Sequence, residues 1–129
     1  MGLKGTGKTK TLVELVRKAV DEEHGDVICI EKDKALTYDI PYQARLVHAS
    51  EYSINSIDLM RGFISGLAAG NFDITHVFID NLFKIIGQVD AQTLAEFLAW
   101  LDSFSEIDFT VTVSADPDGF GEAVTKYII

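Results

Sequence analysis

Residues 1–9 of the chain read MGLKGTGKT, and the last eight of them fit the pattern G-x-x-x-x-G-K-[ST]. Glycines at positions 2, 5 and 7 let the backbone take a left-handed conformation and approach a bound group without a Cβ clash. A helical apolar pattern begins directly afterwards, so the positive end of that helix dipole is expected to face the loop. Backbone N–H groups in such a loop bind phosphate oxygens, and the stretch therefore predicts a phosphate-binding site.

The side chains of this stretch have separate expected roles. Lys8 is expected to reach the β- and γ-phosphates of a nucleoside triphosphate, and Thr9 to give its hydroxyl to Mg²⁺. The alternative is a chance match, which would occur in fewer than about 1% of random chains of this length when glycine is near 7% of residues. The residues predicted to bind the nucleotide are Gly2, Lys4, Gly5, Thr6, Gly7, Lys8 and Thr9.

Outward from this stretch, helical and strand-like segments alternate. Apolar residues at helical spacing predict helices over residues 7–23, 56–69 and 91–104. β-Branched runs predict strands over residues 26–30, 74–80 and 109–115, the last with a less buried face at Thr110 and Thr112. Residues 31–49 read as a small hairpin or irregular edge, because Pro41 has no N–H to donate to a ladder. Three further segments read as an apolar loop or short helix (81–89), a turn-rich stretch (116–124) and a short strand or helix end (125–129).

This alternation predicts the fold class. Strands that alternate with helices of this length imply right-handed crossovers and a mainly parallel sheet. We therefore expect an α/β protein with a three-layer arrangement around a mainly parallel central sheet. The 129 residues suffice for one domain with a sizeable core, over residues 1–129.

Composition excludes several classes of function. Eleven basic and twenty acidic residues give a formal net charge of −9, a poor match to nucleic acid, so no nucleic-acid partner is expected. No apolar stretch approaches the roughly 20 residues of a membrane helix. A lone cysteine, Cys29, cannot form an internal disulfide, which favours a reducing compartment, and we expect a cytoplasmic protein. The three histidines lack metal-ligand spacing, so no zinc site is expected.

Two carboxylates stand at the ends of predicted strands. The segment HVFID ends in Asp80, which is expected to hold Mg²⁺ through a water beside the phosphate loop. Glu31 directly follows DVICI and is expected at the same rim of the sheet, where it could orient water onto the γ-phosphate. The alternatives are a solvated strand end or helix cap for Asp80 and a surface acid beside Lys32 for Glu31.

Together, GLKGTGKT and ITHVFIDNLFKII resemble the RecA-like branch of P-loop NTPases, in which a polar residue follows the Asp as Asn81 does. The resemblance covers roughly residues 2–115. It implies a P-loop NTPase-like fold, ATP and Mg²⁺ as cofactors, Thr9 and Asp80 at the metal, Lys8 and Glu31 as catalytic residues, and Ser114 as a sensor of the γ-phosphate.

The chain departs from that family in three respects. A strand is expected before Gly2; upstream residues or the segment TKYII (125–129) could supply it. No basic DNA-binding loop and no arginine finger are recognisable. The missing finger would slow hydrolysis by about 10³–10⁵.

Three functions follow from these features. The first is an ATP-binding protein with slow Mg²⁺-dependent hydrolysis; the absence of a GTP-specific NKxD pattern favours ATP. The second is a nucleotide-gated switch or interaction module, in which NLFKII and the helix with Trp100 form an interface and copies of the chain associate as a homo-oligomer. The third is a small-molecule kinase, for which no acceptor pocket or Arg-rich lid is evident.

Overall fold

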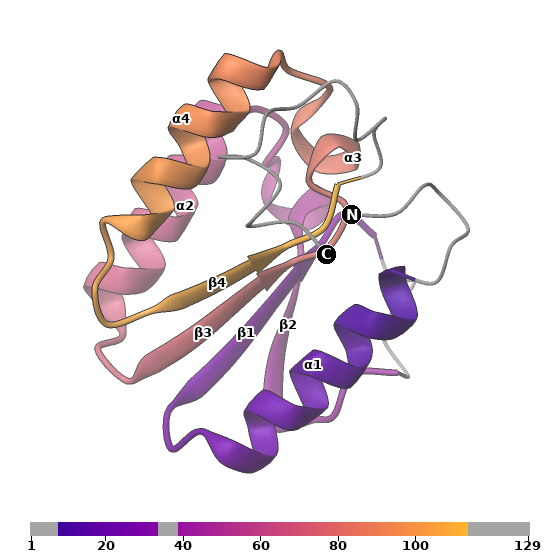
Figure 1. Ribbon diagram of the computed structural model, residues 1–129, viewed down its shortest axis with the longest axis vertical. Coiled ribbons are helices and arrows are strands. Elements are labelled where there is room, and N and C mark those ends of the chain that lie inside the picture. Colours follow the sequence, from indigo (N-terminus) through magenta and orange to yellow (C-terminus); the bar gives the residue numbers. More distant parts are fainter. Residues whose placement is uncertain (1–7, 34–38, 114–129) are drawn as a thin grey trace.

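The computed structural model describes residues 8–33 and 39–113, in which helices and strands alternate (Figure 1). The elements are α1 (Lys8–Glu22), β1 (Asp26–Glu31), β2 (Ala44–His48), the 3₁₀ helix η1 (Ala49–Tyr52), α2 (Ile57–Gly70), β3 (Ile74–Ile79), α3 (Leu82–Ile86), α4 (Ala91–Asp102) and β4 (Asp108–Val111). No helix within these two ranges is long and apolar enough to cross a membrane.

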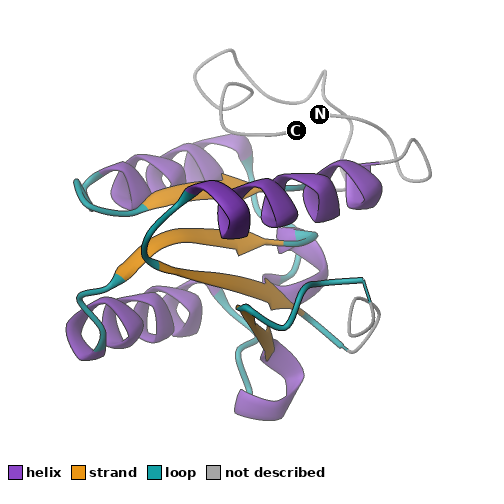
Figure 2. Cartoon of the chain, turned by 90° about the horizontal axis from the view of Figure 1, so that it is seen from below, coloured by secondary structure: helices purple, strands orange, loops and turns teal. Residues whose placement is uncertain are grey.

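The four strands form one open sheet in the order β2-β1-β3-β4, and every neighbouring pair is parallel. The strand arrows accordingly point the same way in Figure 2. β1 lies inside the sheet, where Ile30 pairs with Val47 of β2 on one side and Ile79 of β3 on the other. Its residues 27–31 are all buried, as expected for a parallel strand covered on both faces. The predicted α/β class and mainly parallel sheet are confirmed.

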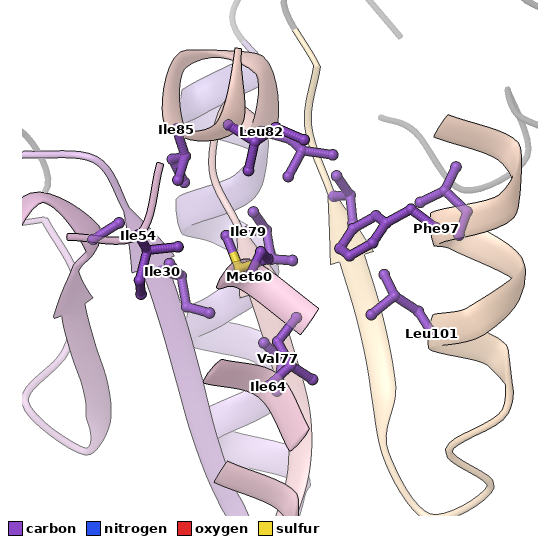
Figure 3. Packing of buried hydrophobic residues seen from close by; sticks show 14 of the residues in the cluster. Ile30, Ile54, Met60, Ile64, Val77, Ile79, Leu82, Ile85, Phe97 and Leu101 are labelled. Carbon is purple, nitrogen blue, oxygen red and sulfur yellow. The ribbon is translucent and has the colours of Figure 1, made fainter. Parts of the chain in front are cut away.

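Helices cover both faces of the sheet, with α1 on one face and α2 and α4 on the other (Figure 1). Successive strand residues point to opposite faces, so Cys29 and Phe78 pack with α1 while Ile30 and Ile79 pack on the other side. Figure 3 shows the larger core on that second face. It is built mainly from Ile30, Val77 and Ile79 of the sheet, Met60 and Ile64 of α2, Leu82 and Ile85 of α3, and Phe97 and Leu101 of α4.

The direction of α1 brings its first turn to the carboxyl ends of the strands. Residues 23–25 link the end of α1 to the start of β1, so the helix runs back along the sheet against the strand direction (Figure 1). His76 secures the far end of the helix: its Nδ1 lies 3.0 Å from Oε2 of Glu23, and its Nε2 lies 2.9 Å from Oγ1 of Thr110. The start of α1 and the ends of the strands therefore meet at one edge.

The structure corrects the sequence-based prediction for residues 31–49. Instead of a hairpin, which would pair antiparallel, residues 44–48 form β2, a parallel strand at the sheet edge. Pro41 lies just before it, where its carbonyl accepts a hydrogen bond from the Ala44 N–H at 3.0 Å. The sequence predicted an edge position for this segment, but it did not predict that residues 44–48 pair parallel to β1.

The other boundaries differ by a few residues. α4 ends at Asp102 rather than residue 104, and β4 ends at Val111 rather than residue 115. Residues 81–89 contain the short helix α3. The segment TKYII lies outside the described residues.

Two glycines provide a matched test of this packing. A Cβ on Gly25 would overlap Cγ2 of Thr75 and the carbonyl oxygen of Asp73, whereas a Cβ on Gly66, in α2, would meet no heavy atom within 4 Å. We expect Gly25→Ala to lower the free energy of unfolding by about 1–3 kcal/mol through overpacking. Gly66→Ala should raise it by roughly 0.5–1 kcal/mol, because alanine loses less backbone entropy in a helix. Urea unfolding measures both, and equal effects of the two changes would contradict the arrangement.

Candidate functional site

Four polar residues stand side by side at the carboxyl edge of the sheet. Glu31 and His48 are the last residues of β1 and β2 and are paired in register. The Asp80 N–H donates to the carbonyl of Ile30 at 2.8 Å, which places Asp80 beside the end of β1. Thr112 follows β4, and its N–H donates to the carbonyl of Ile79 at 3.0 Å. The order along the edge is therefore His48, Glu31, Asp80, Thr112.

The two carboxylates share the face of the sheet that α1 covers. Cys29 and Phe78 pack with α1. Glu31 comes two residues after Cys29 in β1, and Asp80 comes two residues after Phe78, directly beyond the end of β3. Burial raises the pKa of the Cys29 thiol, and the nearby charges of Asp80 and Glu31 raise it further. The thiol therefore stays protonated, and both carboxylates lie close enough to act on the same sulfur atom.

The residues predicted for the phosphate loop meet this edge where they are described. Lys8 and Thr9 begin α1, whose first turn reaches the carboxyl ends of the strands. Gly2, Lys4, Gly5, Thr6 and Gly7 lie outside the described residues, as does Ser114. The structure thus brings together the start of α1, Glu31 and Asp80.

Thr112 holds the Asp80 segment in place. Its hydroxyl accepts a hydrogen bond from the Asn81 N–H at 2.7 Å and donates one to Oδ1 of Asp80 at 3.3 Å. The expectation of a less buried face at Thr112 was wrong, because the residue is 0% exposed. The alternation of Thr112 with apolar residues in the sequence could not show that its hydroxyl forms hydrogen bonds with Asp80 and Asn81.

Asn81 combines an uncommon backbone with an unpartnered side-chain atom. Its φ and ψ are 56° and 66°, in the left-handed region that Asn tolerates better than most residues. Its Oδ1 is buried and has no hydrogen-bond partner in the described structure. A buried acceptor without a donor costs free energy, so this atom lowers the stability of the turn unless a water or another group donates to it.

His48 has a second buried atom of this kind, Nε2. This atom lies 3.7 Å from Oε2 of Glu31, whereas Nδ1 lies 3.3 Å from Oε1 of Glu51. Sequence reasoning missed the residue because it searched the histidines only for metal-ligand spacing. The position of His48 depends on the parallel pairing of β2 with β1.

Comparison of the chain with models of protein families, with curated proteins and with solved structures gave no match. The assignment of the site therefore depends on its own chemistry. In the described part of the chain, no three His, Cys, Asp or Glu side chains are grouped to hold a metal ion. Mg²⁺ is commonly bound by one or two carboxylates together with waters and phosphate oxygens, so this finding does not bear on the role expected of Asp80.

The role of Thr112 can be tested by two substitutions. Thr112→Val keeps the shape but leaves the buried Asn81 N–H without an acceptor, so the free energy of unfolding should fall by about 1–3 kcal/mol. Thr112→Ser retains the hydroxyl and should cost only about 0.8 kcal/mol for the lost methyl group. Urea unfolding compares the two variants. A valine variant as stable as the serine variant would show that the hydroxyl does not hold this turn.

Proposed function

We propose that the chain binds ATP with Mg²⁺ at the carboxyl edge of the sheet and hydrolyses it slowly. One observation carries the proposal: Glu31 and Asp80, from neighbouring strands, lie on the face of the sheet where α1 begins. The sequence directly before and into that helix is G-x-x-x-x-G-K-T. Ligands of open parallel sheets bind outside the carboxyl ends of the strands, which supports this location.

Each residue has a role in this proposal. The backbone amides of residues 5–9 and the Lys8 ammonium bind the phosphates, and the start of α1 contributes its positive dipole end. Thr9 and Asp80 hold Mg²⁺, with Asp80 oriented by the Thr112 hydroxyl. The unpartnered Oδ1 of Asn81 suits a water bound to the metal.

The topology supports a P-loop NTPase-like fold of the RecA-like branch as part of the same proposal. The connections from β2 to β3, through α2, and from β3 to β4, through α4, pass over the same face of the sheet and advance toward β4. Right-handed connections on the opposite face of a sheet advance in the opposite direction. A connection through α1 into β1 would therefore start from a strand on the β4 side of the sheet. A strand that led into the phosphate loop would consequently lie next to β4.

Glu31 is the proposed general base. It is 2% exposed and lies at the end of β1, beside Asp80. In hydrolysis, the oxygen of a water attacks the γ-phosphorus, the water proton passes to Glu31, and the electron pair of the broken P–O bond remains on ADP. Without an arginine finger, the rate is expected to stay about 10³–10⁵ below that of an assisted site.

The interaction-module hypothesis receives no support from α3. Its apolar residues Leu82, Phe83, Ile85 and Ile86 are buried in the core rather than presented to a partner. Trp100 is partly buried, packs against Phe97 and Phe104, and lies 5.3 Å from the Arg61 guanidinium. The described structure therefore favours nucleotide chemistry at the edge over an interface at these two segments.

Titration with a fluorescent ATP analogue and Mg²⁺ tests the proposal. We expect Lys8→Ala to weaken binding roughly tenfold to a hundredfold, because a hydrogen bond to a charged group contributes about 1.5–3 kcal/mol. Lys18→Ala is the matched control, since Lys18 is exposed farther along the same helix. Glu31→Gln should retain binding but reduce phosphate release by about 10²–10⁴.

Three results would contradict the proposal. The wild-type chain could fail to bind the analogue, or Lys8→Ala could bind as tightly as Lys18→Ala. Equal phosphate release by wild type and Glu31→Gln would instead remove Glu31 from the mechanism and leave nucleotide binding intact.

A further inference from the structure

The imidazole of His48 lies between two carboxylates of different exposure. On one side, its Nε2 is 3.7 Å from Oε2 of Glu31, whose side chain is 3% exposed. On the other side, its Nδ1 is 3.3 Å from Oε1 of Glu51, whose side chain is 48% exposed. The ring itself is 17% exposed, so it bridges a buried acid and an acid that reaches solvent.

The backbone holds this arrangement in place. His48 and Glu31 are register partners in β2 and β1, so the ring and the carboxylate extend from adjacent strands. The Ser50 N–H donates to the carbonyl of Lys32 at 3.0 Å, which fastens η1, and with it Glu51, against the end of β1. Among the described residues, the acidic groups within 4.0 Å of the ring are Glu31 from β1 and Glu51 from η1.

The unpartnered Nε2 shows what this ring is suited to do. A neutral ring whose Nδ1–H faces Glu51 presents the lone pair of Nε2 toward Glu31. The gap of 3.7 Å is too long for a hydrogen bond, and Nε2 is buried without a hydrogen-bond partner in the described structure. A proton on Glu31 would give Nε2 its missing partner after a small side-chain movement.

We propose that His48 is a positioning residue that controls the protonation state of Glu31, with Glu51 as its link to solvent. This inference rests on the proposed hydrolysis, in which Glu31 takes a proton from the attacking water. The proton then passes from the Glu31 carboxyl to Nε2 of His48, and Glu51 stabilises the resulting imidazolium. Deprotonation of the ring to solvent beside Glu51 restores the neutral ring and the ionised Glu31.

The arrangement has a consequence for pH dependence. In more acidic solution the ring gains a proton, and an imidazolium beside Glu31 pairs with that carboxylate and lowers its basicity. The hydrolysis rate should then fall as the ring becomes charged. A variant whose side chain at position 48 cannot be protonated should not show this loss of rate.

The coupling can be measured without nucleotide, by following the ring signals of His48 by NMR in the full chain as pH changes. Replacing either acid, as Glu31→Gln or Glu51→Gln, should move the His48 titration to lower pH, because each carboxylate stabilises the charged ring. His24, exposed in the turn after α1, is the internal control and should not move. A His48 titration unchanged by Glu31→Gln overturns the proposal. If that variant does not fold, the carboxyl titration of Glu31 in wild type and His48→Gln measures the same coupling.

The kinetic test uses phosphate release as a function of pH. His48→Gln should bind the ATP analogue as wild type does, lower kcat by about tenfold to a hundredfold, and move the acid limb of the profile to lower pH. A lowered kcat with an unchanged pH profile would indicate packing alone and overturn the proposal. If no variant, wild type included, releases phosphate, the proposed hydrolysis fails, and with it the role of His48 in it. The NMR titration would still show whether the ring and Glu31 are coupled.

Discussion

The parallel pairing of β1 with strands on both sides is the constraint on which the rest of this structure depends. A parallel strand requires a connection that crosses back over the sheet, and the described strands therefore all end at the same edge. Helices cover both faces here, with α1 on one and α2 and α4 on the other (Figure 1). The residues of β1 from Val27 to Glu31 are all buried, because strands flank β1 on both sides and helices cover both of its faces. This single arrangement brings Glu31, Asp80, His48 and Thr112 into one row.

That row is also where the structure departs from ordinary core packing. Glu31 and Thr112 are the buried polar residues of the described chain, and both lie at the carboxyl edge. Asn81 has a left-handed backbone there. Of the four buried side-chain atoms without a hydrogen-bond partner in the described structure, Asn81 Oδ1 and His48 Nε2 lie at this edge, whereas Nε of Arg61 and Oγ1 of Thr75 belong to α2 and to the start of β3. Strain and unsatisfied polar groups reduce stability and tend to be concentrated at functional sites, which agrees with nucleotide chemistry at this edge.

Much of this could be predicted from residues alone, for identifiable reasons. The helices beginning at Lys8, Ile57 and Ala91 follow apolar residues at helical spacing, and Ser56 and Asp90 cap two of them as their side chains suggest. Glu31 and Asp80 were expected at strand ends because short apolar runs precede them. The pairing of β2 could not be predicted, since the parallel register of residues 44–48 with β1 leaves no mark on the local pattern of those residues.

Local pattern alone thus determined the α/β class, the three longer helices α1, α2 and α4, the strands β1, β3 and β4, and the places of Glu31 and Asp80 at strand ends, because apolar periodicity reflects which face of each element is buried. Tertiary structure alone decided which polar groups meet. His48 joins Glu31 only through strand register, and the Thr112 hydroxyl reaches Asp80 and Asn81 only because β4 lies against β3. These contacts join residues far apart in the chain, and periodicity within a segment carries no information about the neighbour that a strand acquires in the sheet.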